Sequence, residues 1–328
     1  MSRKKITIVG AGNVGGAAAR EILRNGFADI VLLDVDDGKA EGKALDLSHA
    51  LAINSLSSNI IGTADWQLTE GSDIVIVTSG VRRRSGMTRD ELFDKNSEII
   101  SSVCGNIVRY SPDSIVVIVS NPLNAMVAVA NSVLRFDASR IMGMAGVLDS
   151  ARFAYYISQE LNVSIDDVKV TVLGDHGDSM LPLARYSSVA GISLTQLLDD
   201  DIISEVVDST RFSGGKLIDL LGYSAYFAAG VSVCKMVESI LMDQKKIVTC
   251  CAWCENEYGL DGVFAGVPVI LGAGGVERVI ELDLNSDEEK AFKVSVSHTN
   301  SILVRLNDTD AESASRQVTM MNDSSTEN

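Results

Sequence analysis

The feature that most constrains the fold is a glycine pattern directly after the first strand-like run. Ile6 to Val9 is short and apolar, and G-x-G-x-x-G follows it as Gly10-Ala11-Gly12-Asn13-Val14-Gly15. Glycines at these positions allow a tight turn and let the backbone approach a pyrophosphate, whose charge is met by the amino terminus of the next helix. The pattern alone is weak evidence, but a strand before it and a helix after it predict a dinucleotide-binding unit.

The second part of this signal is Asp34, which lies 19 residues after Gly15 at the end of the apolar run Ile30 to Leu33. A carboxylate in this place binds ribose hydroxyls and repels a 2'-phosphate. We therefore expect NAD as the cofactor, bound by Asp34 and by all six residues from Gly10 to Gly15. Two alternatives, a flavin or glycines that serve only helix–strand packing, account less well for the spacing, the element order and the acid together.

The first 145 residues alternate short apolar runs with longer helical stretches. The runs are Ile6 to Val9, Ile30 to Leu33, Ile74 to Thr78, Ile115 to Val119 and Arg140 to Met142. Because the runs are continuously apolar, both faces of their sheet should be covered, by helices such as Val14 to Asn25 and Glu91 to Tyr110. We expect an α/β, doubly wound parallel (Rossmann) sheet that forms an NAD-binding domain over residues 1–145.

The pattern changes after residue 145. A helix from Asp149 and a strand at Val168 to Leu173 are followed by helical segments at Ser204 to Leu221 and Ala225 to Met242, by strand-like runs at Ile247 to Glu255, Gly262 to Gly272 and Gly275 to Leu282, and by a helix from the capping box Ser286-x-x-Glu289 to about Leu306. The three runs, separated by Gly and Asn turns, indicate an antiparallel meander. We expect an α+β substrate domain over residues 146–307 and a polar, disordered tail over residues 308–328.

Length and charge limit the number of domains and the kinds of partner. The 328 residues exceed what one hydrophobic core usually supports, which favours two domains. Acidic residues outnumber Lys and Arg by 44 to 28, and the net charge is −16. Because nucleic acids and anionic membrane surfaces would repel such a chain, we expect neither as a partner.

The amino terminus and the cysteines favour a cytoplasmic protein. No signal peptide is visible before Ile6, and the longest apolar runs are far shorter than the roughly 20 residues that cross a bilayer. The five cysteines are an odd number without disulfide spacing. Cys251 and Cys254 have C-x-x-C spacing, but no second pair completes a zinc site, so we expect buried thiols and no metal.

A candidate proton-transfer site centres on His176, which lies between two glycines after an apolar run. Hydride transfer from a carbinol to NAD requires a base with a pKa near neutral, which imidazole provides. Asp149 and Arg152 have i, i+3 spacing and should share one helix face, where Asp149 would orient the ring and Arg152 would bind an anion. His49 and His298 have no comparable surroundings and are interpreted as structural.

A basic loop follows the apolar run Ile74 to Thr78. It contains four arginines within eight residues: Arg82, Arg83, Arg84 and Arg89. Ligands of doubly wound sheets bind beyond the carboxyl ends of the strands, so the loop predicts recognition of an anionic substrate, with Gly80 and Gly86 as hinges. The alternative is a solvated basic loop.

Over residues 4 to 306 the chain resembles the lactate and malate dehydrogenase family. The resemblance rests on six ordered motifs: G-A-G-N-V-G, the acid at Asp34, S-G-x-R-R-R-S-G-M-T-R, S-N-P-L, L-D-S-A-R and G-D-H-G-D-S-M. It implies that His176 transfers the proton, that Asp149 orients it and that Arg152 binds the carboxylate beside the reacting carbon. It also implies that Arg89 polarises the carbonyl, that Asn121 contacts substrate and nicotinamide, and that Asn96, Val119 and Ser120 belong to the cofactor site.

The resemblance places substrate choice at Arg83, six residues before Arg89, where lactate dehydrogenases usually carry Gln. An arginine there gives a second carboxylate a bidentate partner. We therefore expect an enzyme that interconverts malate and oxaloacetate with NAD in the tricarboxylic acid cycle. The resemblance also implies a homo-oligomer, a tetramer more than a dimer. A lactate or dual-specificity enzyme and a silent NAD-binding scaffold are the alternatives, and Arg82 or Arg84 could replace Arg83 as the contact.

Overall fold

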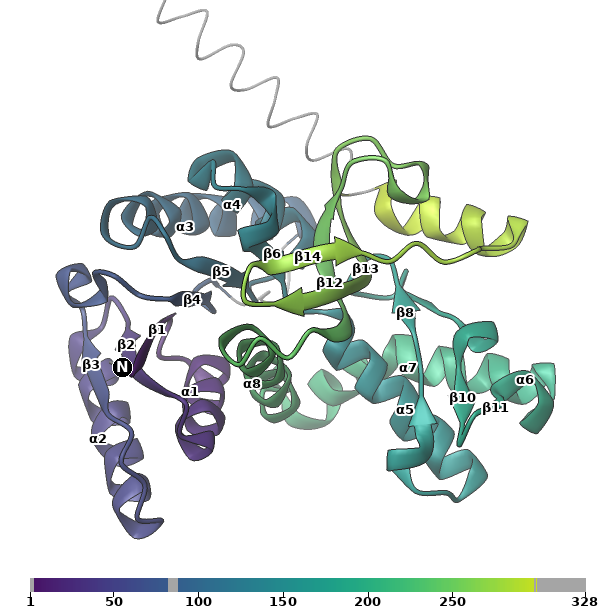
Figure 1. The fold of residues 1–328 in the computed structure, drawn as a ribbon, viewed down its shortest axis with the longest axis horizontal. Helices are drawn as coiled ribbons and strands as arrows, with labels where there is room; N and C mark the ends of the chain where they lie inside the picture. The colour runs from purple at the N-terminus through teal and green to yellow at the C-terminus, as the bar shows by residue number, and fades with distance from the viewer. Residues whose placement is uncertain (1–2, 82–87, 298, 300–328) are drawn as a thin grey trace, which may run out of the picture.

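A nine-stranded sheet forms the centre of the computed structural model, which describes residues 3–81, 88–297 and 299 (Figure 1). Its strand order is β14-β13-β12-β6-β5-β4-β1-β2-β3. Six of these strands pair in parallel: β1 (Lys4–Val9), β2 (Ala28–Leu33), β3 (Ile60–Thr63), β4 (Ile74–Val77), β5 (Ile115–Ile118) and β6 (Ile141–Gly143). The order 3-2-1-4-5-6 is that of a doubly wound dinucleotide-binding sheet, so the predicted fold class is confirmed.

Helices cover both faces of this sheet. They are α1 (Asn13–Asn25), α2 (Asp37–Ile53), α3 (Arg89–Tyr110), α4 (Leu123–Leu134) and α8 (Phe227–Leu241). The helices α5 (Gly146–Leu161), α6 (Leu194–Leu197) and α7 (Asp200–Leu221) contribute to a separate core cluster in the second half of the chain. In Figure 1, α3 and α4 lie above the sheet, and α1 and α8 lie below it. Ile74 and Ile76 pack into the core cluster that contains α1 and α8, whereas Val75 and Val77 pack into the cluster that contains α3 and α4. Burial on both faces explains why the strand is continuously apolar.

The edge strand β3 was not among the predicted strands. Ile60 and Gly62 are partly buried, Ile61 is 52% exposed and the buried fourth residue is the polar Thr63, so the apolar signal is weak. Packing against α2 is nevertheless close, because a Cβ on Gly62 would lie 2.1 Å from the carbonyl oxygen of Ala40. A residue larger than glycine does not fit there.

The predicted meander is confirmed as β12 (Lys246–Cys254), β13 (Val263–Gly272) and β14 (Gly275–Val279), which pair antiparallel. It does not form a separate sheet, because Cys251 of β12 pairs with Gly143 of β6 and so extends the parallel sheet. All five cysteines are buried free thiols, and desolvation raises the pKa of Cys250 to about 12. Within the described ranges, no group of three His, Cys, Asp or Glu residues is arranged to hold a metal ion.

The single strand predicted at 168–173 is wrong in detail. It is divided into β7 (Val168–Lys169), which pairs with β10 (Ser188–Val189), and β8 (Val172–Leu173), which pairs with β9 (Leu181–Pro182). The strand β11 (Ile192–Ser193) completes the sheet of β7 and β10. Elsewhere in the described chain, short 3₁₀ helices occur at Trp66–Thr69, Ala138–Arg140, Ile165–Asp167, Ala184–Tyr186 and Glu257–Gly259. An apolar run does not reveal that its two halves pair with different partners.

The last helix covers 286–297. Its capping box lies one residue before the predicted one, because the Glu288 backbone N–H donates to Asn285 Oδ1 (3.0 Å) and the Asn285 N–H donates to Glu288 Oε2 (2.9 Å). The predicted tail at 308–328 and the helix end at Leu306 lie outside the described residues.

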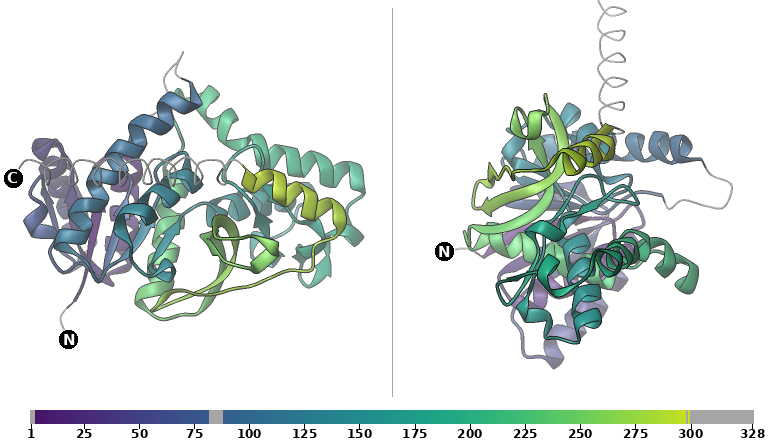
Figure 2. Two further views of the ribbon diagram at one scale, coloured as in Figure 1. Left: turned by 90° about the horizontal axis from the view of Figure 1, so that it is seen from above. Right: turned by 90° about the vertical axis from the view of Figure 1, so that its right-hand side faces the viewer.

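None of the helices in the described part of the chain has the length and hydropathy to cross a membrane. Figure 2 shows most of the first half of the chain (purple to blue) beside most of the second half (teal to yellow).

Candidate active site

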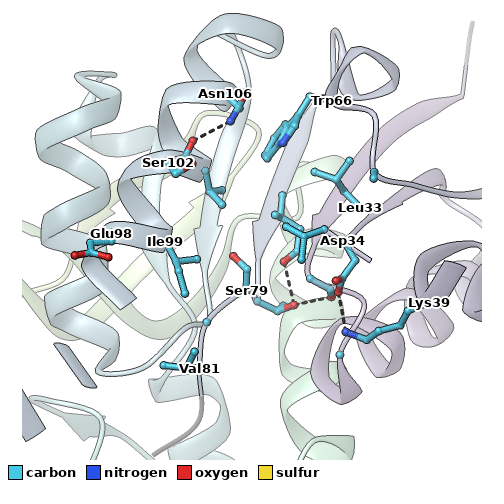
Figure 3. Close-up of a pocket in the computed structure, with 18 residues that line it drawn as sticks. Leu33, Asp34, Lys39, Trp66, Ser79, Val81, Glu98, Ile99, Ser102 and Asn106 are labelled. Carbon is cyan, nitrogen blue, oxygen red and sulfur yellow. Dashed lines mark hydrogen bonds and ion pairs between the residues drawn. The ribbon is translucent and has the colours of Figure 1, made fainter. Parts of the chain in front are cut away.

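A cleft of about 590 Å³ opens where β1 and β4 end (Figure 3). It lies at the switch point of the sheet, since the chain continues from β1 to β2 on one side and from β3 back to β4 on the other. Of the predicted cofactor residues, Gly10, Gly12 and Asp34 line it. Leu33, Trp66 and Ile99 add apolar walls that suit a flat purine ring and were not predicted.

The three glycines of the fingerprint have different roles. Gly10 has a φ of +109°, and a Cβ there would lie 2.7 Å from Thr78 Oγ1. A Cβ on Gly15 would lie 2.0 Å from the Gly10 carbonyl oxygen, so both positions are dictated by packing. By contrast, a Cβ on Gly12 would meet nothing within 4 Å, and no side chain caps α1 there. This open helix terminus fits the pyrophosphate of a dinucleotide.

Asp34 holds the fingerprint turn and faces the cleft. Its Oδ2 accepts hydrogen bonds from the Ala11 backbone N–H (2.7 Å) and from Lys39 Nζ (2.9 Å), and its Oδ1 accepts one from the Asp36 N–H (3.2 Å). Burial raises the pKa of Asp34, but these hydrogen bonds outweigh it and hold the pKa below its usual value. The ionised carboxylate fits ribose hydroxyls.

The structure places the three residues predicted for proton transfer and anion binding together. His176 Nδ1 lies 2.9 Å from Asp149 Oδ2, and Arg152 Nη1 lies 3.3 Å from Asp149 Oδ1. Asp149 is 2% exposed, while the His176 side chain is 19% exposed. Burial lowers the pKa of His176, but the charge of Asp149 and the hydrogen bond to it raise the pKa above its usual value. This geometry suits a proton-transfer group whose Nδ1 donates to a fixed carboxylate.

The turn that carries His176 is anchored to the core. Gly174 exchanges two backbone hydrogen bonds with Gly266 of β13, at 2.8 and 3.0 Å. Ser295 Oγ accepts a hydrogen bond from the Asp175 N–H (2.8 Å), and the Asp175 carboxylate accepts one from the His176 N–H (2.9 Å). Asp175 therefore caps the turn. Ser295 was missed because it lies 120 residues from Asp175 and no local pattern marks it.

Asp149 and Arg152 owe their position to the start of α5. This helix begins at Gly146 directly after β6, so its first turn lies at the carboxyl edge of the sheet, as the cleft does. Beyond Arg152 lies Gly214 of α7, where a Cβ would be 3.7 Å from Nη1, an ordinary van der Waals contact. The sequence did not predict that Gly214 lies next to Arg152, because this contact depends on how α5 packs on α7.

Asn96 is buried next to the cofactor cleft and connects two of the loops around it by hydrogen bonds. Its Oδ1 accepts from the Val81 N–H (2.8 Å), its Nδ2 donates to the Asn121 carbonyl (2.6 Å), and it is 1% exposed. Val119 and Ser120 follow β5, and the Ser120 hydroxyl donates to the Ser79 carbonyl. These bonds join the loops after β4 and β5.

Of the two loop arginines predicted to bind substrate, the structure describes only the backbone of Arg89 and does not describe Arg83. Arg83 lies outside the described residues, together with Arg82 and Arg84. Arg89 is the first residue of α3, which Thr88 and Glu91 cap with a reciprocal capping box. The helix start therefore fixes the backbone of Arg89 at the end of the basic loop.

Comparison with known proteins agrees with this arrangement. The family description "lactate/malate dehydrogenase, NAD binding domain" matches residues 4–143, and "lactate/malate dehydrogenase, alpha/beta C-terminal domain" matches residues 146–305. Malate dehydrogenase from Salinibacter ruber is 47% identical over 300 residues, which are 91% of this chain and 96% of that protein.

Solved structures extend the comparison to the fold. The structure of the Salinibacter ruber enzyme has a TM-score of 0.89 and 45% identity, and covers 94% of this chain and 99% of its own. Lactate dehydrogenase from Cryptosporidium parvum, in complex with lactic acid and nicotinamide adenine dinucleotide, has a TM-score of 0.90 and 38% identity, with coverage of 94% and 99%. The chain belongs to the lactate/malate dehydrogenase family.

Proposed function

We propose that the chain is an NAD-dependent malate dehydrogenase that transfers hydride reversibly between (S)-malate and oxaloacetate. The observation that carries this function is the 2.9 Å hydrogen bond between His176 Nδ1 and the buried carboxylate of Asp149, with Arg152 on the same carboxylate. Malate dehydrogenases that are 43–47% identical to the chain support the choice of substrate. Lactate dehydrogenase is the second candidate, because an enzyme of that name has the same fold at 38% identity.

The geometry of His176 indicates which ring nitrogen exchanges the proton with the substrate. Nδ1 donates to Asp149, which leaves Nε2 to take the hydroxyl proton of malate or to return it to the oxygen of oxaloacetate. The carboxylate of Asp149 stabilises the imidazolium that forms. Arg152 would pair with the carboxylate beside the reacting carbon, and Arg89 would polarise the carbonyl. When bound, the cofactor would accept the hydride from malate and would supply it to oxaloacetate in the reverse direction.

The cofactor would lie along the carboxyl edge of the sheet. Gly12 and the first turn of α1 would hold the pyrophosphate, and Asp34 the adenosine ribose. Val119, Ser120 and Asn121 would line the nicotinamide end, with Asn96 holding their loop. On this basis we divide the chain into an NAD-binding domain to residue 145 and a substrate domain over 146–307.

The substrate preference is tested by kcat/KM for oxaloacetate and pyruvate with NADH. We expect oxaloacetate to be preferred, because pyruvate would leave the Arg83 charge without a partner in a closed site, at a cost of about 1.5 to 3 kcal/mol or about 10- to 150-fold. Arg83→Gln should narrow this ratio, and Arg82→Gln and Arg84→Gln, measured in parallel, identify the contact. A higher kcat/KM for pyruvate in the unaltered protein would favour the lactate dehydrogenase alternative.

We further propose a cytoplasmic homotetramer that acts in the tricarboxylic acid cycle. Support for the assembly is the family membership, and support for the compartment is the set of five buried free thiols. Light scattering should give a mass four times that of the 35.0 kDa chain. A mass of one chain would contradict the assembly.

A further inference from the structure

Lys39 lies at the ribose end of the cofactor cleft and is held there at two points. Its Nζ is 2.9 Å from Asp34 Oδ2, and its backbone N–H donates to Asp36 Oδ1 (3.1 Å), which caps α2. The side chain lines the cleft and points at Asp34 (Figure 3), with 45% of its surface exposed. A flexible ammonium therefore lies beside the carboxylate that would bind the ribose hydroxyls.

The other charged side chains near Asp34 form hydrogen bonds with different partners. The Asp36 carboxylate caps the helix, and Asp37 Oδ1 accepts a hydrogen bond from the Ala64 N–H (2.6 Å). Lys43 Nζ donates to the Gly12 carbonyl (2.9 Å). Lys39 is thus the ammonium that the structure pairs directly with Asp34. A 2'-phosphate would therefore face an ion pair instead of a lone carboxylate.

We propose that Lys39 is a specificity-determining residue that lets the cleft accept NADP(H) in addition to NAD(H). An unpaired carboxylate at Asp34 would repel a phosphate on the ribose 2'-oxygen, which is the usual basis for excluding NADP. The ammonium of Lys39 offsets that charge, and its exposed stem leaves it free to turn from Asp34 to the phosphate. NAD(H) stays the better ligand because Asp36 and Asp37 keep the surroundings negative. This inference rests on the proposed cofactor site.

The test is fluorescence titration of the full-length protein with NADH and with NADPH, without substrate. In Lys39→Met the ratio of the NADPH to the NADH dissociation constant should rise about two- to fivefold, as expected for loss of one partly exposed charge contact. Lys39→Arg should keep the ratio near that of the unaltered protein. Lys290→Met removes the same charge from the exposed pair with Asp287 on the last helix and should not change the ratio.

Adenosine 2',5'-bisphosphate and AMP, which lack the nicotinamide half, serve as competitors that isolate the ribose end. The bisphosphate should lose affinity in Lys39→Met by the same factor, and AMP should lose little. An unchanged NADPH to NADH ratio in Lys39→Met would overturn the role of Lys39 while leaving the cofactor site intact. Failure of the unaltered protein to bind NADH would instead refute the proposed function, and the inference with it.

Discussion

Replacement of His176 by Asn is expected to lower kcat for oxaloacetate reduction by about 10²- to 10⁴-fold, the range that general acid–base groups supply. The amide is close in size to imidazole and keeps a polar contact with Asp149, but it neither accepts nor releases a proton near neutral pH. Because the cofactor cleft is lined by other residues, NADH should bind with little change. Stopped-flow turnover and NADH fluorescence titration measure the two effects separately.

His49→Asn provides the matched control. His49 is exposed on α2 and takes no part in the proposed chemistry, so this variant should keep the turnover of the unaltered protein. If His176→Asn retained turnover within about threefold, another group would have to transfer the proton. A loss of NADH binding in the same variant would point to a structural role for the turn.

The features that the sequence predicted well have local signals. The strands of the parallel sheet are continuously apolar because both faces are buried, as Val75 and Ile76 of β4 show by packing into different core clusters. The fingerprint at Gly10 to Gly15 is contained in one turn and one helix start. For His176, Asp149 and Arg152, family motifs supplied the pairing that residue spacing alone only suggested.

The features that were missed depend on tertiary contacts. Ser295 reaches the His176 turn from the last helix, and Gly214 lies beside Arg152 through the packing of α5 on α7. Lys39 lies five residues after Asp34, but only the structure shows its side chain turned back on the carboxylate. β3 was missed because an edge strand with exposed residues lacks the apolar run that marks the buried strands.

Asp149→Asn is expected to lower kcat/KM for oxaloacetate by about 10²-fold or more at neutral pH, because the neutral amide no longer stabilises imidazolium. In the unaltered protein, burial lowers the pKa of His176, but the charge of Asp149 and its hydrogen bond raise the pKa above its usual value. Oxaloacetate reduction needs the protonated ring, so the rate is high below this pKa and falls as pH rises through it. Asparagine removes the charge of Asp149 and its charge-assisted hydrogen bond. The charge of Asp175 still raises the pKa of His176, while burial and the charge of Arg152 continue to lower it.

The pH at which oxaloacetate reduction falls should therefore move to lower pH in Asp149→Asn, and the rise of malate oxidation, which needs the neutral ring, should move in the same direction. Glu160→Gln is the matched control, because it removes an exposed carboxylate from the same helix and should leave both profiles in place. A purely structural role for Asp149 would lower activity at every pH without moving either profile. Coincident profiles for the variant and the unaltered protein would show that Asp149 does not set the proton affinity of His176.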